Sequence, residues 1–173
     1  MVRLLVRAGA RSVAVGDNPG WGLSLLEATV GLAGFLRRLE AEGATLVAFD
    51  AKPPVPVANP GAFLFDPVPL PRAVLEADVY INLPKMKTHV HTLVTLGIKN
   101  QYGLILDDNR MPFHRNDINL KIVDILRAIR PHLTVVDGLW AVQGQAPLSG
   151  SSLPDMNVVV AGADVCAVDT VCA

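Results

Sequence analysis

Hydrophobic residues of this chain fall into short runs rich in β-branched side chains, separated by longer stretches of mixed polarity. Such runs, bounded by turn residues, are typical of buried strands. Five of them predict strands, at Ser12–Val15, Thr45–Phe49, Val79–Asn82, Thr134–Val136 and Asn157–Ala161.

Helices are predicted between these strands. Ser24 and Glu27 have the spacing of a capping box and Gly43 can end a helix, so Ser24–Glu42 is predicted to be helical. Asp117–Arg130 has an apolar face and is followed by Pro131, and a further helix is expected to begin near Asp164. Strands alternating with helices predict an α/β, Rossmann-like domain with a mainly parallel sheet of about five strands and flanking helices.

The length of 173 residues fits a single domain spanning 1–173, and 51% apolar residues suffice for a core. A proline-rich excursion over about 52–71 interrupts the alternation and is expected to form a short hairpin around Ala62–Phe65. The last predicted helix reaches the final residue, which predicts that the domain is C-terminally truncated. Apolar surface exposed in that way could favour a homo-oligomer.

Charge and hydropathy exclude several classes of partner. The net charge of −1 and the pI near 6.4 give no general attraction to nucleic acid or to an anionic membrane. No apolar run approaches the roughly 18 residues of a membrane span, and Arg3, Arg7 and Arg11 interrupt the first apolar segment. A cytoplasmic location is therefore predicted.

Polar or glycine residues end or directly follow each predicted strand. They include Asp17, Asp50, Asn82, the pair Asp137-Gly138, and Asp164. Ligands of open parallel sheets bind beyond the carboxyl ends of the strands, so this pattern predicts a site at that edge. The alternative is that Gly, Asp and Asn are simply favourable turn residues.

Residues 78–103 concentrate cationic and amide side chains: Asn82, Lys85, Lys87, Thr88, His89, His91, Lys99, Asn100 and Gly103. Lysine ammonium groups suit phosphate or carboxylate ligands, although a solvated basic loop would have the same composition. Lys99 lies in an apolar run, LGIKNQYG, and a partly buried lysine needs a partner. We expect that partner to be Asp137, Asp164 or Asp169.

The histidines allow two kinds of chemistry. His89 and His91, together with His114 and an aspartate, could bind a divalent metal and leave one position open. The spacing is not that of a helical zinc site, however, and nearby lysines would repel a cation. General acid–base catalysis by His89 or His114 is the other prediction.

Two aspartates near the carboxyl end need separate interpretation. Asp164 could bind a substrate, or it could cap the helix that follows it. Asp169 lies within an apolar helical turn and should have a partner, for which a lysine of the site is expected. The glycines of GDNPGWG match no phosphate-binding loop, and no serine nucleophile elbow is present.

The run ADVYINLPKMKTHVHTLVTLGIKNQYGLI resembles the signature of the DUF362 family. His114 in FHRND, then RPHLTVVDGLWAVQGQAPLSG and VVVAGADVCAVDTV, follow in the family's order. The resemblance implies a shared fold and site but no substrate. Some members carry an added ferredoxin-like domain. This chain, with only Cys166 and Cys172, lacks iron–sulfur cluster ligands, so a cluster would have to come from a partner or from another segment.

The leading hypothesis is an enzyme that acts on a small anionic metabolite. Lys85 and Lys87 would hold the anion, Lys99 would position it with Asn100, and His89 or His114 would move protons. Asp137 and Asp169 would orient the cations, and further contacts are expected from Asn82, Thr88, Gly138 and Asp164. One alternative is a non-catalytic metal- or cofactor-binding module that serves an iron–sulfur partner. Another is a structural domain whose lysines pair internally with aspartates.

Overall fold

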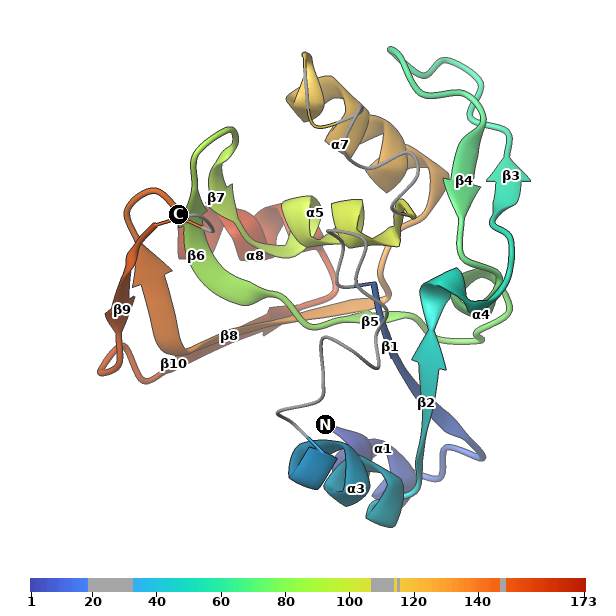
Figure 1. Ribbon diagram of the computed structural model, residues 1–173, viewed down its shortest axis with the longest axis vertical. Coiled ribbons are helices and arrows are strands. Elements are labelled where there is room, and N and C mark those ends of the chain that lie inside the picture. The colour runs from blue at the N-terminus through green and yellow to red at the C-terminus, as the bar shows by residue number, and fades with distance from the viewer. Residues whose placement is uncertain (19–32, 107–113, 115, 147–148) are drawn as a thin grey trace.

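The computed structural model describes residues 1–18, 33–106, 114, 116–146 and 149–173, which form a mixed α/β fold (Figure 1). The helices are α1 (Val2–Arg7), α3 (Ala33–Ala41), α4 (Arg72–Leu75), α5 (Gly97–Asn100), α7 (Ile118–Ala128) and α8 (Val165–Cys172), with short 3-10 turns η2 (Phe49–Ala51) and η3 (Gln101–Leu104). The strands are β1 (Val13–Asp17), β2 (Ala44–Ala48), β3 (Val55–Val57), β4 (Val68–Leu70), β5 (Ile81–Asn82), β6 (Lys85–His89), β7 (Leu93–Thr95), β8 (Leu133–Gln143), β9 (Ser151–Leu153) and β10 (Val158–Gly162).

The five predicted strands are present as β1, β2, β5, β8 and β10, but they do not form one parallel sheet. β1 and β2 pair with each other in a separate parallel sheet. The other three belong to a mixed sheet centred on β8, in which β5 and β6 are parallel to β8 whereas β9 and β10 are antiparallel to it.

The prediction of a mainly parallel sheet was therefore wrong, and a Rossmann-like arrangement is not confirmed. The physical reason lies in the connection after β8. Parallel neighbours need a crossover, usually a helix, whereas here the chain turns back and pairs as β9 and then β10 on the strand it has just left. Apolar runs locate strands but do not specify their partners.

Strand β6 is the main element that the sequence pattern missed, because its polar residues were interpreted as a loop. It pairs with β7 on one side and β8 on the other. Its register on β8 shifts between Lys85 and Lys87, which is an irregularity of the bulge type. Met86 packs against the core cluster of Leu96, Val136 and Val168.

Helices α5 and α8 lie together over the face of the main sheet that carries this core, where α8 contacts both β8 and β10 (Figure 1). A second and larger core joins α7, η3 and β4 through Ile125, Tyr102 and Leu70. The short helix α5 lies between these two cores and contacts both α7 and α8. The segment that carries Lys99 and Asn100 is therefore held from two sides.

The proline-rich excursion forms the expected hairpin, with β3 and β4 antiparallel and Ala62–Phe65 in the connection between them. The carboxylate of Asp124, fully buried on α7, anchors that connection. It accepts hydrogen bonds from the backbone N–H groups of Phe63, Leu64 and Phe65 at 2.8–2.9 Å.

The predicted helices are confirmed where the structure describes them. α7 and α8 lie within their predicted ranges. α3 is the C-terminal part of the predicted first helix and is followed by Gly43 with φ +93°, while the Ser24–Glu27 capping box lies outside the described residues. α1 was not predicted. None of the helices in the described ranges has both the length and the apolar character that crossing a bilayer requires.

Candidate functional site

Lys85 and Asp137 form an ion pair between β6 and β8, with 2.9 Å between Nζ and Oδ2. The Lys85 hydrogen bond is the main cause that lowers the pKa of Asp137, and a second hydrogen bond from the Leu139 N–H acts in the same direction. Both side chains are about half exposed, at 42% and 50%. Lys85 is therefore already neutralised by a protein carboxylate.

Lys87 lies two residues further along β6 and has a different environment. Burial lowers its pKa, and the carboxylate of Asp17, at the end of β1, partly opposes that effect. Among the described residues, no carboxylate oxygen lies within ion-pairing distance of its ammonium group. The end of β1 thus lies near the middle of β6, although the two strands belong to different sheets.

His89, two residues further along β6, is buried, and four basic side chains act on its ionisation. Burial is the main cause that lowers its pKa to about 4, and the positive charges of Lys99, His91, His114 and Lys87 contribute to the same shift. The His91 ring lies 5.8 Å from the His89 ring. We call these five residues, Lys87, His89, His91, Lys99 and His114, the basic cluster.

Tyr102 links two members of the basic cluster and was not singled out from the sequence. Its buried ring meets His114 edge-on, with 4.5 Å between centroids. The Lys99 ammonium lies 4.8 Å from the centroid of the same ring, a cation–π geometry. In the sequence, the i, i+3 spacing of Lys99 and Tyr102 could have indicated this contact, because residues at that spacing lie on one side of a helical turn.

Asp169 and Asn82 fix the position of α5, which carries Lys99. Asp169 accepts hydrogen bonds from the backbone N–H groups of Gly97 at 2.6 Å and Ile98 at 2.8 Å. Asn82 donates to the Gly97 carbonyl at 2.7 Å and accepts from the Asn100 side chain at 2.8 Å. The expected lysine partner of Asp169 was therefore wrong, because its partners are two backbone amides.

Gly97 allows this close packing of α5 against α8. A Cβ atom there would lie 2.6 Å from Val165 Cγ2 and 2.9 Å from both Asp169 Oδ1 and Thr134 Cγ2. Such distances are well inside normal van der Waals contact. Any side chain at position 97 would push α5 away from the carboxylate that holds it.

Three other predicted site residues have structural partners. Thr88 donates from Oγ1 to the Gly144 carbonyl at 2.7 Å. Asp164 caps α8 by accepting from the N–H groups of Cys166 and Ala167, as its alternative interpretation predicted. Gly138 permits close packing, since a Cβ there would lie 2.9 Å from Val158 Cγ1. A binding role for these three stays a prediction.

Metal binding by the histidines also stays a prediction. Within the described parts of the chain, no group of three or more His, Cys, Asp or Glu side chains has an arrangement that could hold a metal ion. In addition, Nδ1 of His89 accepts a hydrogen bond from the His91 N–H at 3.1 Å, so that nitrogen is occupied.

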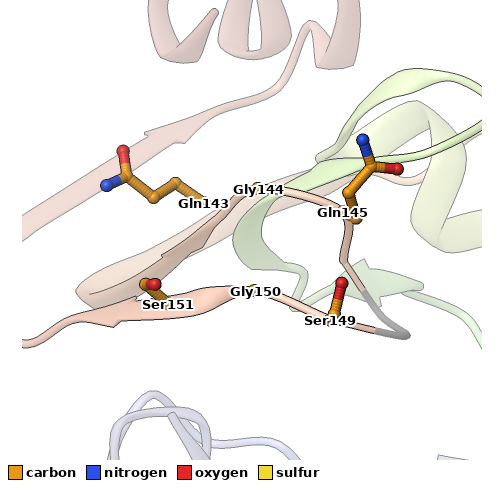
Figure 2. A pocket seen from close by; sticks show the side chains of 6 residues that line it. All are labelled: Gln143, Gly144, Gln145, Ser149, Gly150 and Ser151. Carbon is orange, nitrogen blue, oxygen red and sulfur yellow. The ribbon is translucent and has the colours of Figure 1, made fainter.

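An open polar depression of about 540 Å³ lies beside the β8–β9 hairpin (Figure 2). Its lining residues are Gln143, Gly144, Gln145, Ser149, Gly150 and Ser151. Two hydrogen bonds connect the end of β6 to the segment that follows β8. The Thr88 hydroxyl donates to the Gly144 carbonyl, and the Val90 N–H donates to the Ala146 carbonyl at 3.1 Å. The depression thus adjoins the end of β6, but no residue of the basic cluster lines it.

Comparisons with known proteins agree with the motif order. The family described as "Domain of unknown function (DUF362)" matches residues 1–173. A thylakoid-associated protein of Synechocystis sp. is 28% identical over 180 residues, which cover 99% of this chain and 53% of that relative. The chain therefore spans about half the length of the curated relative it matches. No solved structure matches the chain.

Proposed function

The chain belongs to the DUF362 family, whose description leaves its function open, and we propose that it binds and acts on a small anionic metabolite at the basic cluster. The observation that carries this proposal is the environment of His89. A buried side chain is surrounded there by groups that are, or can become, positively charged, and each of them disfavours a further positive charge.

An anion would relieve the electrostatic repulsion within the cluster. Burial of Lys87 disfavours its charged form, and Asp17 offsets that only in part. An oxyanion placed against Lys87 and Lys99 would favour both ammonium groups, as phosphate and carboxylate ligands do. A bound anion would thus add attraction to each of these charges and offset the repulsion among them.

The surrounding residues support this role by fixing geometry. Asp169 and Asn82 hold the turn that carries Lys99, and Tyr102 lies beneath its ammonium group. A binding site needs such support, because a misplaced charge loses most of its effect on a ligand. In the enzymatic form of the proposal, His114 is the candidate for proton transfer, since its ring is oriented by Tyr102.

The competing hypothesis of a structural domain with internal Lys–Asp pairs fits one lysine well. Lys85 is paired with Asp137 at 2.9 Å, as that hypothesis requires. It does not fit Lys87, for which the described residues provide no carboxylate within ion-pairing distance. We therefore assign anion binding to Lys87 and a supporting role to Lys85. An iron–sulfur partner and a cytoplasmic location stay predictions.

Calorimetric titration with phosphate, sulfate, oxalate and citrate tests the proposal. We expect Lys87→Met to weaken binding of the preferred anion at least tenfold, and Lys85→Met to weaken it less than threefold. Lys52→Met, at an exposed lysine after η2, is the control for loss of one positive charge. Equal effects of all three substitutions would show only nonspecific electrostatics and would reject the site.

A further inference from the structure

The protonation of the His89 ring follows from a local hydrogen bond. Nδ1 of His89 accepts from the backbone N–H of His91 at 3.1 Å, so Nδ1 carries a lone pair. A neutral imidazole has one protonated nitrogen and one acceptor nitrogen. The proton of the neutral ring therefore lies on Nε2.

The neighbours of His89 keep the ring neutral. Lys87 lies on the same strand, His91 follows it, Lys99 approaches from α5, and His114 completes the group. All four oppose a second proton on the ring, as does burial, and the resulting pKa of His89 is about 4. The negative charge of Asp17 raises the pKa of Lys87.

The Nε2–H group of the neutral His89 ring is a hydrogen-bond donor. His89 is 8% exposed, and among the described residues its one side-chain hydrogen bond is the bond that Nδ1 accepts, so Nε2–H can donate to a ligand. A ligand oxygen at this position would satisfy the donor.

We propose that His89 presents Nε2–H as a fixed, uncharged hydrogen-bond donor to an oxyanion that Lys87 and Lys99 bind. This inference rests on the proposed function and narrows its ligand class to oxyanions that offer a deprotonated, acceptor-only oxygen, such as a phosphate or carboxylate oxygen. It also assigns His89 a positioning role in place of the proton transfer and metal ligation that the sequence suggested. Proton transfer, where it occurs, belongs to another residue.

Nitrogen NMR of histidine-labelled protein at pH 7 tests the inference, with inorganic phosphate as the probe. His132 is an internal control, because its Nδ1 accepts a backbone N–H from Tyr80 at 3.0 Å and it lies outside the basic cluster. We expect both rings to show the Nε2–H tautomer and only the Nε2 signal of His89 to shift when phosphate is added. A protonated Nδ1 or a charged His89 ring at pH 7 would overturn the inference.

Substitutions provide a second readout that does not depend on assignment of the spectra. His89→Gln places an amide N–H near the position of Nε2 and should keep phosphate affinity within about threefold, whereas His89→Ala should lose about tenfold or more, the effect of one hydrogen bond to a charged group. His132→Ala should leave affinity unchanged. Circular dichroism would establish that each variant is folded.

The outcomes separate the two proposals. Phosphate binding that needs Lys87 but neither shifts His89 nor responds to His89→Ala would overturn this inference and leave the proposed function standing. Absence of binding by the unsubstituted protein to phosphate, sulfate, oxalate and citrate would overturn both.

Discussion

The carboxylate of Asp169 on α8 accepts a hydrogen bond from the backbone N–H of Gly97, the first residue of α5, with 2.6 Å between oxygen and nitrogen. The other carboxylate oxygen binds the next N–H, that of Ile98. A side chain remote in sequence thus supplies the cap that α5 lacks locally, since Leu96 precedes it. This contact connects the last helix of the chain to the turn that carries Lys99.

Removal of this cap should destabilise the protein and weaken the site together. Asp169→Ala leaves two N–H groups without acceptors, and we expect a loss of about 2–3 kcal/mol in the free energy of unfolding. Asp169→Asn retains one acceptor oxygen and should lose about half as much. Urea denaturation measures both, with Asp155→Ala in an exposed turn as the control. A loss below 0.5 kcal/mol for Asp169→Ala would contradict the capping role.

Position 97 should accept no side chain. Gly97→Ala places a methyl group within 2.6–2.9 Å of three atoms, so we expect a destabilisation of about 1–3 kcal/mol. Gly103→Ala is the matched control, because a Cβ there meets nothing within 4 Å. Thermal unfolding of the two variants should differ by several degrees. Equal melting temperatures would mean that α5 is not packed as closely as described.

The ion pair of Lys85 and Asp137 should contribute little to stability. Because both side chains are about half exposed, solvent screens their attraction, and we expect a coupling of less than about 1 kcal/mol. A double-mutant cycle with Lys85→Met and Asp137→Asn measures that coupling. A value above 2 kcal/mol would favour a structural role for this pair over the supporting role assigned to it here.

His89 should make stability depend on pH in a defined interval. Its folded pKa of about 4 lies below the ordinary value of 6.5, so the unfolded chain takes up a proton first as the pH falls. The contribution is fully present above pH 6.5 and is lost as the pH falls towards 4. We expect a loss on the order of 1–2 kcal/mol, since solvent screens part of the full shift.

Denaturation of the parent and of His89→Gln at pH 7.0 and 4.5 isolates the contribution of His89 to the pH dependence of stability, because the other titrating groups contribute to both proteins. The unfolding free energy of the parent should fall further than that of the variant. Parallel pH profiles would show that the His89 ring is as easily protonated in the folded state as in the unfolded one.

Asp124 should be among the least replaceable carboxylates of the described chain. It is fully buried and accepts three backbone hydrogen bonds from the connection between β3 and β4. Asp124→Ala should destabilise the protein by about 3 kcal/mol or more. Limited proteolysis should then cleave the variant near Phe63, while Asp50→Ala, at an exposed position, should resemble the parent.

The sequence by itself determined where strands and helices form and which segment carries the cationic side chains. Apolar runs located β1, β2, β5, β8 and β10, and the amphipathic face and its flanking residues located α7. These features depend on local periodicity and capping, which the sequence contains directly. The alternation of Lys85, Lys87 and His89 with Met86 and Thr88 was also readable, but their polarity favoured a loop over the strand β6.

Only the tertiary structure decided which of these residues meet. Pairing of strands and contacts between distant side chains depend on packing across the fold, which no local pattern encodes. Asp137 could have paired with any of several lysines, and the register of β6 on β8 selected Lys85. The fold placed Asp169 on the amides of α5 and left Lys87 and His89 among other cationic groups, because helix packing and strand order set those distances.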